Sequence, residues 1–276
     1  MIPIIGCLPR SGSTLLSALL RQNPSIEVTP TGWMLGLVNG LSQAYTANPA
    51  RIAWKDQGKA KRRFHTAIRG ACSGYLDTPG AALTIEKGRG WLHWFETLEA
   101  AFGEPPKIIL PVRDLRGCVS SMERAYRRNP ESVGVGGGAP TVQARAMQWM
   151  NPQSVPLGRA IAELRDGMHR GVVDRCLVVR YEDLAQQPLA VLSRVYNFLG
   201  YEMLPATHNI EHVEEPNREH DAVHGPIGDH VIPPGPVRHN EPDYVDVLGP
   251  EVADGIVRDN QWFYSAFYPE RLRASE

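Results

Sequence analysis

The sequence has few cysteines and no long apolar run. Its four cysteines, Cys7, Cys72, Cys118 and Cys176, are scattered without the spacing of a metal site. This pattern argues against a disulfide framework and predicts reduced thiols in a cytosolic protein. No stretch approaches the roughly 18 apolar residues of a membrane span, and the N-terminus lacks the basic region and cleavage site of a signal peptide. We therefore expect a cytoplasmic protein with no membrane span.

The sequence also lacks an excess of charge of either sign. It has 29 Lys and Arg against 30 Asp and Glu, so its net charge is −1. A bulk polyelectrolyte partner such as nucleic acid is not expected, although basic residues can cluster locally. Residues 56–76 are one such cluster, basic and amphipathic with helical spacing. The length of 276 residues, without repeats or a linker, predicts one α/β domain spanning 1–276.

The opening of the chain contains no Walker A motif, yet it has the order of an anion-binding junction. An apolar run leads into Pro-Arg-Ser-Gly-Ser-Thr at 9–14, and an apolar-periodic segment follows. This order predicts a buried strand, a loop and a helix start, where unpaired N–H groups and the helix dipole attract anions. The alternative is an ordinary strand–helix turn. The candidate ligand-binding residues are Arg10, Ser11, Gly12, Ser13 and Thr14.

Further along the chain, strands alternate with helices. Besides the opening strand, strands are predicted at 25–28, 81–86, 107–112 and 175–180. Helices are predicted at 33–45, 56–76, 91–102, 115–128, 141–151, 153–170, 188–199 and 251–265. Such alternation indicates βαβ units and a mainly parallel sheet. Segment 205–245 is rich in His, Pro, Gly and Asp and is expected to be irregular, as a ligand-ordered segment often is.

A second set of candidate residues follows the strand at 107–112. Arg113 leaves the strand's carboxyl end, where open α/β sheets bind ligands, and Ser121 lies two helical turns into the next helix. Arginine supplies bidentate phosphate contacts, so the pair is a candidate phosphate grip. The alternative is a surface Arg-Asp pair with an unrelated helix serine.

Together these stretches resemble sulfotransferases that use 3′-phosphoadenosine 5′-phosphosulfate. Residues 9–16 are similar to the 5′-phosphosulfate loop, in the form found in bacterial and tyrosylprotein sulfotransferases, and residues 112–122 are similar to the 3′-phosphate element. The resemblance implies a P-loop-containing three-layer α/β/α fold. It also implies in-line sulfuryl transfer to a hydroxyl or amine without a metal, leaving adenosine 3′,5′-bisphosphate.

Two later stretches extend this resemblance. Residues 177–184, Leu-Val-Val-Arg-Tyr-Glu-Asp-Leu, are similar to a family turn that would put Tyr181 near the adenine. We interpret the charged residues around Tyr181 (Arg180, Glu182 and Asp183) as a helix-capping salt-bridge cluster. Residues 225–229 faintly resemble a loop that closes over the nucleotide, implying a contact from Gly228. The basic pair that usually precedes that loop is missing, and Arg238 or His230 are candidate substitutes.

The catalytic groups are less complete. Arg10 stands where many relatives have lysine, and because arginine stays protonated we assign it charge neutralisation and not proton delivery. Lys87, with Arg89 beside it, ends a strand in the position of a lysine that neutralises the sulfate in tyrosylprotein sulfotransferases; the alternative is a solvated loop. The acidic base of those relatives has no counterpart here. The candidates left open are Glu27, His65 and His93.

The acceptor cannot be read from the sequence beyond a small molecule or peptide that bears a hydroxyl group. The glycine-rich stretch 134–140 is interpreted as a surface loop, and whether it is a lid stays open, as does a homodimer. Two other functions also stay open: an ATP-dependent P-loop phosphotransferase, and a nucleotide-binding protein without catalysis.

Overall fold

The computed structural model describes residues 1–6, 8–128, 139–203, 209–210, 235–237 and 244–273. A five-stranded sheet in the order β2-β3-β1-β4-β5 forms the centre, and every neighbouring pair is parallel. Its strands are β1 (Pro3–Gly6), β2 (Ile26–Val28), β3 (Leu83–Gly88), β4 (Lys107–Val112) and β5 (Leu177–Arg180). Each lies at a position predicted from the sequence, and the predicted parallel α/β architecture is confirmed.

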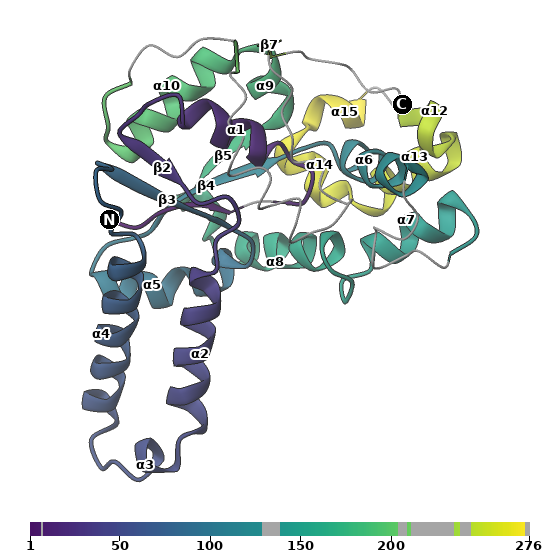
Figure 1. The fold of residues 1–276 in the computed structure, drawn as a ribbon. Helices are drawn as coiled ribbons and strands as arrows, with labels where there is room; N and C mark the ends of the chain where they lie inside the picture. Colours follow the sequence, from purple (N-terminus) through teal and green to yellow (C-terminus); the bar gives the residue numbers. More distant parts are fainter. Residues whose placement is uncertain (7, 129–138, 204–208, 211–234, 238–243, 274–276) are drawn as a thin grey trace.

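Helices and short 3-10 turns connect and cover these strands (Figure 1). They are α1 (Ser13–Leu20), α2 (Met34–Ala47), α3 (Pro49–Ile52), α4 (Gln57–Tyr75), η1 (Trp91–Trp94), α5 (Phe95–Phe102), α6 (Leu115–Arg128), α7 (Val142–Met150), α8 (Leu157–His169), η2 (Val173–Arg175), α9 (Tyr181–Gln186), α10 (Pro188–Leu199), α12 (Tyr244–Leu248), α13 (Pro250–Asp259), α14 (Gln261–Phe267) and α15 (Pro269–Arg273). Two short strands, β6 (Asn209–Ile210) and β7 (Gly235–Pro236), pair antiparallel.

The sheet has a hydrophobic layer on each face, because alternate residues of a strand point to opposite sides. On one face Ile5 and Ile109 pack with residues of α1 and α10. On the other, Ile4 and Ile108 belong to a larger core that includes residues of α5, α6, α8 and α14. The result is the predicted three-layer α/β/α arrangement, with the β1–α1 loop at the carboxyl edge of the sheet.

The prediction of a single C-terminal helix over 251–265 is wrong. The helix breaks at Asn260, which has φ −125° and ψ 34°, between α13 and α14. The Asn260 side-chain amide donates to the carbonyl of Ile256 at 2.9 Å. The Asn260 carbonyl accepts the N–H of Phe263 at 2.9 Å. One residue thus closes the first helix and opens the second, which apolar periodicity cannot reveal.

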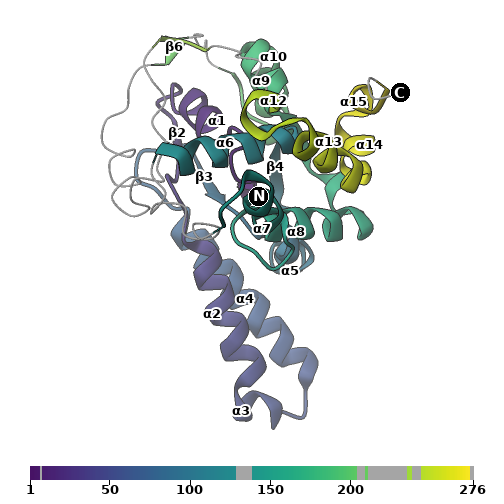
Figure 2. The same cartoon turned by 90° about the vertical axis from the view of Figure 1, so that its right-hand side faces the viewer.

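Helices α2 and α4 run antiparallel and extend away from the sheet as a long arm with α3 at its end (Figures 1 and 2). Among the described residues, no helix is long and apolar enough to cross a bilayer. Cys72, Cys118 and Cys176 are free thiols, and burial raises the pKa of each to about 12. Cys7 lies outside the described residues.

Candidate functional site

The β1–α1 junction has the geometry of an anion site. Gly12 caps α1 in the left-handed conformation at φ 88°, and no side chain of the described residues caps this helix start. Ser13 and Thr14 are the first two helical residues, so first-turn N–H groups remain available to a ligand. The fully buried Ser11 fixes the loop from inside, because its hydroxyl donates to the carbonyl of Leu8 at 2.6 Å.

Arg10 joins this loop to the second predicted element. Its Nε donates to Ser121 Oγ at 2.9 Å, and its own carbonyl accepts from Arg113 Nη1 at 3.1 Å. Arg10 also has φ 63°, a strained conformation for a residue other than glycine. The structure therefore brings Arg10 together with Arg113 and Ser121, which lie more than 100 positions further along the chain and which the sequence had assigned to the same ligand.

Positive charge is concentrated at this point. Burial lowers the pKa of Arg10, and the nearby charges of Arg113 and Arg128 lower it further. Arg113 Nε is buried and has no hydrogen-bond partner within the described residues. A buried donor of this kind lacks the compensation that burial normally requires, and an anionic ligand would supply it. Arg128, at the end of α6, was not predicted; its spacing from Arg113 gave no signal.

Tyr181 forms one wall of the same site. The Arg113 guanidinium lies 4.3 Å from the centre of the Tyr181 ring, a cation–π distance. A Cβ added at Gly12 would meet Tyr181 Cδ2 at 2.5 Å. Glycine is therefore required at position 12 both by its positive φ and by the close approach of this ring.

Lys87 reaches the loop from the neighbouring strand β3. The side chain is only 7% exposed, and its Nζ donates to Thr14 Oγ1 at 3.3 Å. Its backbone is fixed as well: its N–H donates to Thr29 Oγ1 at 2.8 Å, and its carbonyl accepts the N–H of Gly32 at 2.8 Å. Arg89, the second cation named for this loop, is exposed.

Glu86, directly before Lys87, is a buried carboxylate that the sequence interpretation missed. The Thr29 hydroxyl donates to Oε2 at 3.1 Å, whereas Oε1 has no partner within the described residues. Burial raises the pKa of Glu86 to about 7, and the hydrogen bond from Thr29, with the nearby Tyr75 hydroxyl and Met34 N–H, opposes that rise. An acidic residue in a strand predicted to be buried was the available signal.

The three residues named as possible bases lie apart from this cluster. Glu27 is half-buried on β2, and its charge acts on Arg21. His65 lies midway along α4 with its ring against Phe64. His93 is exposed on η1. Other named residues lie outside the described part (Gly228, His230, Arg238 and most of 134–140).

The interpretation of Arg180, Glu182 and Asp183 as one helix-capping salt-bridge cluster is wrong. Glu182 is buried and accepts hydrogen bonds from the backbone N–H of Asp114 and from the Tyr268 hydroxyl. Arg180 instead pairs with Glu270 of α15. Arg180 and Glu182 contact residues of the C-terminal segment and do not cap α9. Local sequence spacing does not show such long-range contacts.

This geometry is that of an α/β protein with a candidate anion-binding loop at the carboxyl edge of its sheet. The model of a sulfotransferase family matches residues 3–205, and the chain belongs to this family. The family predicted from residues 9–16 and 112–122 is thereby confirmed.

The chain is also similar to a curated protein and to solved structures. Nodulation protein NoeE of Sinorhizobium fredii is 27% identical over 216 residues, covering 71% of this chain and 49% of NoeE. The chain thus spans about half the length of this curated relative. Mouse sulfotransferase SULT7A1 has the same fold, with a TM-score of 0.51 at 13% identity, covering 93% of this chain and 81% of the mouse chain. Sulfotransferase STF9 from Mycobacterium avium gives 0.49 at 14% identity over 97% of this chain and 76% of STF9.

Proposed function

We propose that this protein transfers a sulfuryl group from 3′-phosphoadenosine 5′-phosphosulfate to a hydroxyl or amine acceptor. The observation that carries the proposal is the convergence of Arg10, Arg113 and Ser121 on an uncapped helix start. A ligand with phosphate groups at both ends of an adenosine matches two separate anion-binding elements. The mouse sulfotransferase with the same fold was solved in complex with PAP, which supports the same ligand class.

The residues divide into two groups along such a ligand. Arg113, with its unpartnered Nε, and Ser121 would hold the 3′-phosphate, and Tyr181 would lie beside the adenine. Lys87 and Thr14, in mutual contact, would face the 5′-phosphosulfate. In the transfer, the bond from sulfur to the bridging phosphosulfate oxygen breaks and a bond to the acceptor oxygen or nitrogen forms.

Catalysis would then consist of positioning and charge stabilisation. Negative charge grows on the bridging oxygen as the sulfuryl group leaves, and preorganised cations and N–H donors stabilise it. Lys87 is the cation that contacts the Thr14 hydroxyl at the start of α1, while Arg10 links the loop to α6. The acceptor's proton is lost to a base that stays unassigned among Glu27, His65 and His93. We propose a cytoplasmic single-domain enzyme, with a small molecule or peptide as acceptor and no metal.

The first test is nucleotide binding. Calorimetry should show that adenosine 3′,5′-bisphosphate binds tightly, while adenosine 5′-monophosphate and ATP with magnesium bind weakly. R113A should weaken the bisphosphate by ~10- to 100-fold, because it removes charge-assisted contacts to one phosphate. R124A, an exposed arginine on the same helix, is the matched control and should bind as the wild type does. Equal affinity for the monophosphate would overturn the two-phosphate assignment.

The second test is turnover, measured as labelled sulfate transferred from the donor to a panel of phenols. R10A should abolish transfer. K87M should lower kcat by ~100- to 1,000-fold, the usual cost of removing one transition-state charge donor. R89A removes an exposed cation two residues away and should leave turnover unchanged. Transfer that survives both R10A and K87M would refute these roles, and nucleotide binding without any transfer would favour the non-catalytic alternative.

A further inference from the structure

The arm, residues 33–76, projects beyond the rest of the molecule as two helices joined by α3 (Figures 1 and 2). Its burial is confined mostly to the end near the sheet, since α2 has only Met34 and Val38 buried. Farther out the helices contact one another, as in the stacking of Tyr45 on Phe64 at 4.5 Å. The outer half of the arm therefore adds little to the core.

The arm also carries a charge opposite to that of the remaining chain. It has seven Lys and Arg and one Asp, a net charge of +6, while the whole chain carries −1 and the remainder therefore −7. Asp56 is engaged in capping α4, where its carboxylate accepts the N–H of Lys59 at 2.7 Å. Six cations are exposed and have no ion pair among the described residues: Lys55, Lys59, Lys61, Arg62, Arg63 and Arg69.

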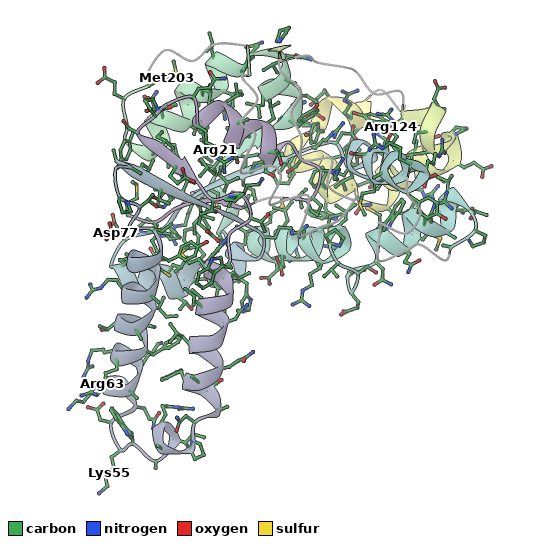
Figure 3. All side chains as sticks on the ribbon, viewed as in Figure 1. Arg21, Lys55, Arg63, Asp77, Arg124 and Met203 are labelled. Atoms are coloured by element: carbon green, nitrogen blue, oxygen red, sulfur yellow. The ribbon has the colours of Figure 1, made fainter. Side chains whose placement is uncertain are left out.

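Two large apolar side chains occupy the tip, residues 49–56. Ile52 is 58% exposed and Trp54 is 39% exposed. The Arg63 guanidinium lies 5.2 Å from the centre of the Trp54 ring. Lys55 points outward from the far end of the arm, and Arg63 lies along its side (Figure 3). Apolar and aromatic groups at an extreme end, surrounded by cations, match the composition of membrane-surface anchors.

We propose that the tip of the arm binds the surface of an anionic lipid bilayer, with Ile52 and Trp54 entering the headgroup region and the surrounding cations contacting lipid phosphates. A narrow convex tip does not supply the ~800 Å² per partner of a stable protein interface. A bilayer needs only a few interfacial side chains, since each nearby cation adds ~1 kcal/mol. The phosphates of a nucleic acid would pair with the cations, but a nucleic acid would provide no apolar surface to bury Ile52.

The inference is independent of sulfuryl transfer. The helix α2 is 14 residues long and therefore spans about 20 Å. An arm bound at its tip would hold the sheet's carboxyl edge at roughly that distance from the lipid surface. The negative remainder of the chain would favour that standoff, because anionic lipids repel it. The cytoplasmic leaflet carries the required anionic lipids.

The test is flotation of the full chain with vesicles of phosphatidylcholine alone or with phosphatidylglycerol added. Binding should require phosphatidylglycerol and should fall as salt is raised. R62E should weaken binding by at least ~5-fold, the equivalent of one surface cation. R124E is the matched control, because Arg124 is also an exposed helix arginine without an ion pair in the described structure, and it should bind as the wild type does.

A second pair of variants tests the apolar part. W54S should reduce binding, whereas M147S, which removes a more exposed apolar side chain from α7, should not. Bisphosphate affinity should stay unchanged in all four variants and serves as the folding control. Equal binding to neutral vesicles, no binding at low salt, or equal losses in R62E and R124E would overturn the proposal. Self-association in sedimentation experiments that W54S abolishes would instead assign the tip to a second copy.

Discussion

Glu86 shows how one buried residue connects the arm to the site. Lys87 points toward α1, so Glu86, its neighbour on the strand, points to the opposite face of the sheet. There its carboxyl group interacts with Tyr75 at the end of α4 and with the N–H of Met34 at the start of α2. Its full burial on the far side from Lys87 makes Glu86 a residue that positions the strand end and the arm, and argues against a role as general base.

The raised pKa of Glu86 gives a testable dependence of stability on pH. Between the usual value near 4.5 and about 7, the folded protein holds a proton that the unfolded chain has lost. Stability from this group is therefore complete below the lower value and is lost as pH rises through 7. The loss between pH 5 and 8 should be about 2 to 3 kcal/mol.

Urea unfolding across this pH range measures the effect. E86Q replaces the carboxyl with a neutral group of the same shape, so its unfolding free energy should lack this decline. E27Q, on the neighbouring strand, controls for the removal of a carboxylate and should keep the decline. An E86Q profile parallel to that of the wild type would show that Glu86 does not titrate in this range.

At the scale of elements, local pattern accounts for what was predicted correctly. Most strands contain a short apolar run, and β1 with its loop and α1 could be predicted because strand, turn and helix start are encoded within twenty residues. Asn260 and the α13–α14 break could not, since a hydrogen-bonding side chain interrupts a continuous apolar period. The extension of α2 and α4 away from the sheet could not be predicted either. The same periodicity is found in helices packed on a core and in helices packed on each other.

In the candidate site, too, some residues could be located from the sequence, whereas their contacts could not. The positions of Arg113 and Ser121 followed from where a parallel strand ends. The link from Arg10 to Ser121, and the charge of Arg128 beside it, depend on contacts between distant segments. The same holds for the unassigned base, because the sequence contains several acidic and histidine residues and only tertiary structure separates those near Lys87 from the rest.

At the scale of the whole molecule, two buried tyrosines connect the C-terminal helices to the candidate site. The Tyr264 hydroxyl donates to Asp114 at 2.8 Å, and the Tyr268 hydroxyl donates to Glu182 at 2.7 Å. Burial, together with the adjacent carboxylates, raises the pKa of both hydroxyls, so both remain donors. Asp114 and Glu182 directly follow the site residues Arg113 and Tyr181, and the C-terminal helices thereby fix the backbone that presents them.

These tyrosines predict a coupled loss of stability. Y264F and Y268F should each lower the unfolding free energy by about 1 to 3 kcal/mol, because each leaves a buried carboxylate with one donor fewer. The Asp114 N–H donates to Glu182 at 3.3 Å, so the two carboxylates form one network and the double variant should depart from additivity.

Y201F is the control for these single and double variants. The Tyr201 hydroxyl also donates a hydrogen bond, to the carbonyl of Ala82 at 3.0 Å, but this hydrogen bond is exposed. Its effect should stay within about 0.5 kcal/mol. If Y264F and Y268F behaved as Y201F does, the C-terminal helices would merely cover the sheet. A large and non-additive loss, accompanied by weaker bisphosphate binding, would show that they hold the strand ends in the geometry that the ligand requires.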